Sequence, residues 1–235
     1  LEPFAARHRV IMYSQRYYWP NPRPTDLSGY TTANHAADLA ALIETLDLEP
    51  AFVVGTSYGA YITLTMTIAH PELIRGLVIA EPPILSWMQD TVQDRALLAP
   101  FTTTAVEPSR AALASGDLEE GLRIFIDGVV GSPGTFDALP SEIRGRMMEN
   151  APLAEAGLRE PYLPMFTRNE AQRITAPVLL VQGAESPSFF GRILDQLQQN
   201  LPNCERVTIP NASHTMWGVN PKACNEAALG FLSRQ

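Results

Sequence analysis

Short apolar runs of strand length alternate along this chain with longer segments of helical periodicity. The expected strands cover residues 10–13, 51–54, 76–80, 175–182 and 206–209. The expected helices cover residues 31–46, 58–70 and 221–232, with a further one through Ile193, Leu194 and Leu197. Strands that alternate with helices of this length form βαβ units, in which neighbouring strands run parallel. We therefore predict an α/β fold with a mainly parallel sheet flanked by helices.

The stretch between the third and fourth expected strands departs from this alternation. Residues 84–173 show helical patterns broken repeatedly by proline, without the alternation that is typical of a strand. Proline removes a backbone donor and ends or kinks a helix. We predict that residues 84–173 form an inserted helical lid, and that residues 1–83 and 174–235 form the α/β core.

The charge balance disfavours several classes of partner. The chain has 17 Lys plus Arg against 25 Asp plus Glu, a net charge of -8. This is the wrong sign for binding a phosphate backbone, so we expect no nucleic-acid partner. No apolar run reaches the roughly 18 residues of a membrane span, and no secretory signal is evident. Cys204 and Cys224 are too few for a disulfide framework, which favours a reducing, cytoplasmic setting or thiols without a role, and they lack metal-ligand spacing, so we expect no metal site.

The segment Gly55-Thr56-Ser57-Tyr58-Gly59 lies between an expected strand and an expected helix. This is a G-x-S-x-G pattern in the strand-turn-helix setting of a nucleophile elbow, in which a strained turn exposes the serine hydroxyl. Ser57 is therefore the candidate nucleophile. The backbone N–H of Tyr58 is the candidate oxyanion donor at the positive end of the helix. The alternative is an ordinary turn whose serine caps the helix.

A serine nucleophile needs a base that accepts its proton. Four histidines are available. His8, His35 and His70 lie before a strand, within a helix and at a helix end, and we interpret them as structural. His214 lies in a polar turn between the last strand and the last helix, where a loop reaches the carboxyl edge of the sheet. His214 is the predicted base, and an exposed loop histidine is the alternative.

The base in turn needs a carboxylate that orients its ring and stabilises its charged form. Glu81 ends the third expected strand, where a buried carboxylate needs a partner. Glu185 follows the fourth. Either residue gives the chain order serine, acid, histidine. The alternatives are an ion pair or helix cap for Glu81, and a solvated loop charge for Glu185.

Together these features resemble the α/β-hydrolase superfamily, most closely its lid-bearing bacterial-type serine hydrolases. The similarity rests on Gly55-Thr56-Ser57-Tyr58-Gly59, Ala69-His70-Pro71-Glu72-Leu73-Ile74, Gly76-Leu77-Val78-Ile79, Pro177-Val178-Leu179-Leu180-Val181-Gln182-Gly183 and Ala212-Ser213-His214. In many relatives the acid occupies the position of Ser186, which cannot serve. Other relatives place it at the position of Glu81. The resemblance therefore favours Glu81, with Glu185 as the substitute.

The resemblance also implies an activity. We expect hydrolysis of a small or medium carboxylic ester, thioester or lactone through an acyl-enzyme, with no metal or organic cofactor. A C–C bond hydrolase or a cofactor-free perhydrolase would use the same three residues. A non-catalytic small-molecule-binding homologue is the alternative from another class. The sequence does not specify the oligomeric state.

Two features depart from the family pattern. The loop after the first expected strand is rich in aromatic residues, and Tyr17 and Trp19 either line the substrate pocket or pack in the core. Trp87 and Phe166 in the predicted lid carry the same two interpretations. The family's second oxyanion donor has no counterpart in these residues. Since residues 1–9 read as the end of a helix leading into a strand, we expect that donor upstream of Leu1. The alternative is an incomplete site in an inactive protein.

Overall fold

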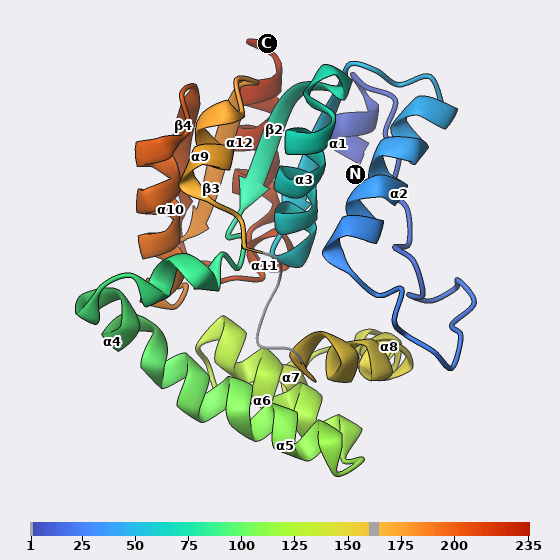
Figure 1. Cartoon of the computed structure of the whole chain (residues 1–235), viewed down its shortest axis with the longest axis vertical. Helices are drawn as coiled ribbons and strands as arrows, with labels where there is room; N and C mark the ends of the chain where they lie inside the picture. The colour runs from blue at the N-terminus through green and yellow to red at the C-terminus, as the bar shows by residue number, and fades with distance from the viewer. Residues whose placement is uncertain (1, 160–164) are drawn as a thin grey trace.

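A computed structural model of the chain describes residues 2–159 and 165–235. Its centre is a parallel sheet in the order β1-β2-β3-β4, as Figure 1 shows. The strands are β1 (Ala51–Thr56), β2 (Ile74–Ala80), β3 (Val178–Gly183) and β4 (Cys204–Ile209). Every neighbouring pair runs parallel. The prediction of an α/β fold with a parallel sheet is confirmed.

Helices cover both faces of this sheet because alternate strand residues point to opposite sides. Leu77 and Ile79 of β2 pack in one core cluster, whereas Val78 and Ala80 pack in another. The first cluster includes residues of α2 (Thr32–Thr45), α3 (Tyr58–Ala69), α9 (Arg168–Arg173) and α10 (Ser188–Asn200). The second includes residues of α1 (Glu2–Ala5), α11 (Met216–Val219) and α12 (Pro221–Leu232). The sheet is thus the middle of three layers.

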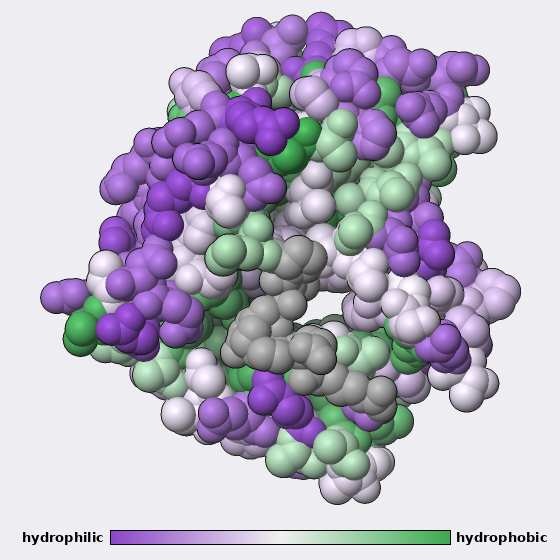
Figure 2. Space-filling model, in the orientation of Figure 1, coloured by the Kyte–Doolittle hydropathy of each residue, from purple (hydrophilic) through white to green (hydrophobic). Residues whose placement is uncertain are grey.

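The segment between β2 and β3 is helical in its described residues. After the short 3-10 turn η2 (Leu85–Gln89) come α4 (Val92–Phe101), a π-helical turn η3 (Thr102–Val106), α5 (Glu107–Ala114), α6 (Leu118–Val130), α7 (Thr135–Ala138) and α8 (Ser141–Arg159), whereas the 3-10 turn η1 (Pro71–Leu73) precedes β2. In Figure 1 the helices from α4 to α8 form a layer beyond the end of the sheet to which the β2 arrow points. Figure 2 shows the surface hollowed between this layer and the sheet-bearing part. No helix in residues 2–159 and 165–235 is long and apolar enough to span a membrane.

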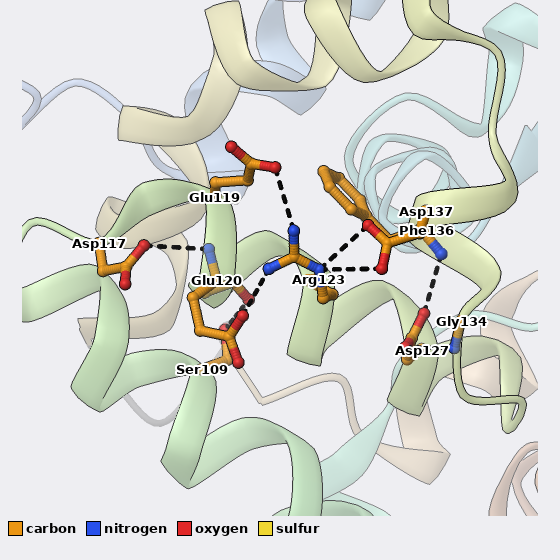
Figure 3. Close-up of polar contacts among 10 residues, drawn as sticks. Ser109, Asp117, Glu119, Glu120, Arg123, Asp127, Gly134, Phe136 and Asp137 are labelled. Carbon is orange, nitrogen blue, oxygen red and sulfur yellow. Dashed lines mark hydrogen bonds and ion pairs between the residues drawn. The ribbon is translucent and has the colours of Figure 1, made fainter.

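Two charged residues of α6 hold the turn into α7, as Figure 3 shows. The Arg123 guanidinium bonds Asp137 at 3.1 Å and also contacts two glutamates of its own helix. The Asp127 carboxylate accepts from the N–H groups of Gly134 and Phe136 at 2.7 and 2.9 Å. Because these acceptors satisfy amides at the start of α7, they fix its direction relative to α6.

The strand expected at residues 10–13 is wrong. These residues carry neither a helix nor a strand assignment, and Met12 is 72% exposed. A strand requires a hydrogen-bonded neighbour. Within the described residues β1 is an edge strand whose neighbour is β2, so no strand lies beside residues 10–13. An apolar run indicates that a segment has strand propensity, but whether a neighbouring strand is present to pair with it depends on the rest of the fold.

Candidate active site

Ser57 occupies a sharp turn between β1 and α3. Its backbone has φ 50° and ψ -124°, a conformation that residues with a Cβ rarely adopt. The turn is tight because Gly55 has no side chain: a Cβ there would lie 2.8 Å from the carbonyl oxygen of Gly59. The Ser57 N–H donates to the carbonyl oxygen of Ala80 at 2.8 Å. This bond ties the turn to the carboxyl end of β2.

Glu81 follows β2 directly and is completely buried. Its backbone also has a positive φ, 43°. One carboxylate oxygen, Oε2, lies 2.7 Å from Nδ1 of His214, and the other, Oε1, accepts from the Gly183 N–H at 2.8 Å. A buried carboxylate is costly unless its oxygens are paired. Here each oxygen has a partner, and the carboxylate places the ring proton of His214 on Nδ1.

His214 lies in the loop between β4 and α11 and is 8% exposed. Its ring stacks on Phe190 of α10, with centroids 4.4 Å apart and planes 15° apart. The preceding Ser213 donates its hydroxyl to the carbonyl oxygen of Val130 at 2.5 Å. Two ring contacts and an anchored neighbour therefore hold the imidazole in one orientation.

Gly183 allows this loop to approach the end of β3. A Cβ on Gly183 would lie 2.6 Å from the carbonyl oxygen of Ala212 and 2.7 Å from that of Ser213. Any side chain here would push the loop, and with it His214, away from Glu81. Since the Gly183 N–H also binds Glu81, this glycine is a positioning residue for the pair.

Ser57, Glu81 and His214 all follow carboxyl ends of strands, which meet at one edge of a parallel sheet. Within the described residues, no hydrogen bond joins the Ser57 hydroxyl to the His214 ring. Nε2 of His214 likewise has no partner there, so the one nitrogen that Glu81 does not bind is available to a neighbouring hydroxyl. Such contacts are often long without substrate and tighten on binding.

Glu185 is exposed, in contrast to Glu81. Its backbone N–H donates to the carbonyl oxygen of Ala212 at 3.0 Å. Glu185 lines a separate hollow of about 460 Å³ next to the loop that contains Asn211 and Ser213. The structure thus brings Glu81, and not Glu185, into contact with His214.

The three remaining histidines lie apart from this arrangement. His8 packs edge-on against Phe52, and His70 caps the end of α3. His35 is 1% exposed, and neither ring nitrogen has a hydrogen-bond partner. Burial therefore lowers the pKa of His35, an effect that the nearby Asp38 only partly opposes.

A cleft of about 530 Å³ opens beside Ser57. Its walls come from the loop after residue 12, the nucleophile turn and α8. They are formed by Tyr13, Ser14, Gln15, Tyr18, Trp19, Thr56, Ser57, Tyr58, Gly59, Arg146 and Asn150. This volume is in the range of small-molecule sites. Sequence reasoning missed Gln15, Arg146 and Asn150, although the spacing of the last two on one helix face was a usable signal.

Of the four aromatic residues expected to line the pocket, only Trp19 lines this cleft. Trp87 and Phe166 are both buried, and they stack with centroids 5.9 Å apart. The indole N–H of Trp87 donates to the carbonyl oxygen of Phe166 at 2.6 Å. Tyr17 has a positive φ and packs its hydroxyl close to Gly29. Of the two interpretations, core packing describes Trp87 and Phe166, and Tyr17 lies outside this cleft lining; sequence alone does not distinguish a core aromatic from a pocket aromatic.

Tyr58 is the first residue of α3. The first amides of a helix have no acceptor within it and lie at its positive end. The Tyr58 side chain lies within 3.3 Å of the Thr32 hydroxyl, and burial raises its pKa to about 12. The phenol is therefore protonated at neutral pH, and it forms part of the cleft wall. Residues 2–159 and 165–235 contain no cluster of three or more His, Cys, Asp or Glu suited to a metal ion.

Comparisons with known proteins agree with this geometry. A family profile described as alpha/beta hydrolase fold matches residues 1–221. BpoC of Mycobacterium tuberculosis, which carries the provisional name of a non-heme bromoperoxidase, is 29% identical over 97% of this chain and 84% of its own. The 2-(acetamidomethylene)succinate hydrolase of Mesorhizobium japonicum is 25% identical over 96% and 79%. The solved structure of Rv0554 from Mycobacterium tuberculosis has a TM-score of 0.61 and 25% identity, over 100% of this chain and 83% of its own.

Proposed function

Because the chain belongs to the alpha/beta hydrolase fold family, we propose that it is a serine hydrolase that cleaves a small or medium carboxylic ester, thioester or lactone. The observation that carries this proposal is the buried contact between Glu81 and His214, supported by the Gly183 N–H. A histidine whose Nδ1–H is held by a carboxylate presents a basic Nε2, and this is the role that a serine nucleophile requires. Ser57, on the strained turn at the same sheet edge, is the proposed nucleophile.

The proposed reaction has two halves. In the first, Ser57 Oγ forms a bond to the acyl carbon while its proton passes to Nε2 of His214. The leaving alcohol or thiol then takes that proton as its bond to the acyl carbon breaks. In the second half, water attacks the acyl-enzyme, His214 again accepts and returns a proton, and the free acid departs. Glu81 stays ionised throughout and stabilises the imidazolium. None of these steps calls on a metal or an organic cofactor.

Two further elements support the chemistry. The Tyr58 N–H, at the positive end of α3, is the proposed donor to the oxygen that becomes negative in each tetrahedral intermediate. Helices α4 to α8, which lie within the predicted lid segment 84–173, are the proposed lid, because α8 contributes Arg146 and Asn150 to the cleft wall. A lid that covers the cleft excludes bulk water and strengthens the electrostatic interactions beneath it.

The first test is covalent labelling of Ser57. A fluorophosphonate should add to the wild-type protein in one-to-one stoichiometry, as measured by intact mass spectrometry, and should not add to Ser57→Ala. Hydrolysis of 4-nitrophenyl butyrate should fall in the same variant by about 10³-fold or more. A folded wild-type protein that neither takes the label nor hydrolyses esters would refute the proposal and favour a non-catalytic binding role.

The same ester assay also tests whether the protein uses hydrogen peroxide, as the name of the relative BpoC suggests for that protein. Hydrogen peroxide is a nucleophile that can replace water in the second half of the reaction and release a peracid from the acyl-enzyme. Adding peroxide to the ester assay measures how the acyl group divides between the two. Peracid that disappears with Ser57→Ala would extend the proposed activity to perhydrolysis.

A further inference from the structure

The cleft beside Ser57 contains a positively charged side chain, although the net charge of the whole chain is negative. Among the described residues that line it, Arg146 of α8 is the only charged one. The chain as a whole carries a net charge of -8. The remaining wall consists of serine, threonine, glutamine, asparagine, glycine and aromatic residues. The guanidinium is paired with one carboxylate, that of Glu149, and no described residue of the cleft lining adds a second carboxylate that would compete with an anionic ligand.

The contacts of Arg146 leave one edge of its guanidinium open. Nη1 donates to Oε2 of Glu149 at 2.8 Å. The guanidinium carbon lies over the Trp19 ring, 3.2 Å from its centre, so the indole face packs against the cation. In the described part of the chain, no acceptor contacts Nε or Nη2. These two donors form the edge that binds a carboxylate through two parallel hydrogen bonds.

Asn150 holds the stacked pair in place. Its side-chain oxygen accepts from the backbone N–H of Trp19 at 3.0 Å, and its side-chain NH₂ donates to the backbone carbonyl oxygen of Arg146 at 3.2 Å. The loop that carries Trp19 and the helix that carries Arg146 are therefore joined at the cleft. Because stacking restricts the long arginine side chain before any ligand arrives, less conformational entropy is lost on binding.

We propose that Arg146 binds a carboxylate of the substrate, so that the preferred ester carries an anionic group in addition to the bond that is cleaved. This inference rests on the proposed serine-hydrolase function and specifies its substrate class. A sphere with the volume of this cleft is about 10 Å across, so a ligand that spans it reaches both Arg146 and Ser57. A chain of about six carbons, counted from the carboxylate carbon to the acyl carbon with both included, fits that span.

Two esters with the same six-carbon acyl chain test the assignment. Mono-4-nitrophenyl adipate carries a terminal carboxylate, whereas 4-nitrophenyl hexanoate ends in a methyl group. We expect Arg146→Gln to lower kcat/KM for the adipate ester about 10- to 100-fold, the loss typical of a charge-assisted pair. The hexanoate ester should change less than about 3-fold. Arg144→Gln is the matched control, since Arg144 lies on the same helix and binds the carbonyl oxygen of Asp137 instead.

A binding measurement separates failure of this inference from failure of the proposed function. Adipamate, with one carboxylate, should bind the wild-type protein more tightly than the neutral adipamide in ligand-observed NMR, and Arg146→Gln should remove the difference. Glu149→Gln should increase the preference for adipamate, because it removes the competing carboxylate. Equal binding of both compounds, or equal loss for both esters, would overturn the anion site whether or not Ser57 is active. Selective adipamate binding by a protein that hydrolyses neither ester would retain the site and refute the hydrolase.

Discussion

The replacement Glu81→Gln tests the proposed triad at Glu81, which is completely buried. The wild-type carboxylate has two acceptor oxygens, one bound to the Gly183 N–H and one facing Nδ1 of His214. An amide has the same shape but only one oxygen. Because the backbone N–H of Gly183 is always a donor, the amide oxygen must face it. The amide NH₂ then faces His214 and demands an acceptor at Nδ1.

This exchange moves the ring proton of His214 to Nε2, the nitrogen that has to accept the proton of Ser57. The favoured tautomer is then the wrong one for a base, and the imidazolium also loses its negative partner. We expect kcat to fall about 10³- to 10⁴-fold, which corresponds to about 4 to 5.5 kcal/mol of transition-state stabilisation. KM should change little, because Glu81 is completely buried and does not line the cleft.

Steady-state hydrolysis of 4-nitrophenyl butyrate measures this loss, and circular dichroism with a thermal melt establishes that the variant is folded. Glu185→Gln is the matched control. Its exposed side chain should alter kcat by less than about 2-fold. If folded Glu81→Gln kept kcat within tenfold of the wild-type value, or if Glu185→Gln were the damaging change, the tautomer argument would be refuted.

Two further predictions concern positioning and stability. Gly183→Ala places a Cβ 2.6 Å from the Ala212 carbonyl oxygen and should lower the free energy of unfolding by about 1–3 kcal/mol in urea melts, together with kcat. Gly145→Ala, where a Cβ meets nothing within 4 Å, should do neither, and equal behaviour of the two variants would contradict the prediction. Burial lowers the pKa of His35, so the unfolded chain takes up a proton first and stability falls as the pH drops below about 6.5. His35→Leu should flatten that fall in denaturant midpoints compared at about pH 5 and about pH 8, and an unchanged slope would count against the assignment.

Patterns local in the sequence were sufficient for most of the fold. The apolar runs and helical spacings anticipated β1 to β4, α2, α3 and α12 to within a few residues, and they indicated a helix at α10 without its bounds, because each element is specified by its own periodicity. The exception is residues 10–13, whose composition suits a strand. Strand formation there depends on a neighbouring strand, which local sequence does not encode.

Part of the candidate site could likewise be predicted from local sequence, and part depends on tertiary contacts. The turn at Ser57 was visible in the sequence because glycines at fixed offsets are needed for a tight strand-to-helix turn. The choice between Glu81 and Glu185 was not, since it depends on a contact between residues 133 positions apart. Only folding brings the end of β2 beside the loop after β4.

What the sequence by itself determined was therefore the kind of chain: a parallel α/β protein with an elbow serine, a loop histidine and two candidate acids. The tertiary structure decided which acid contacts His214, which aromatic residues are core, and that Arg146 faces the cleft with Ser57. The physical reason is the range of the interactions. Turn geometry and amphipathic periodicity act over a few residues, whereas burial, pairing and the shape of a cleft arise where distant segments meet.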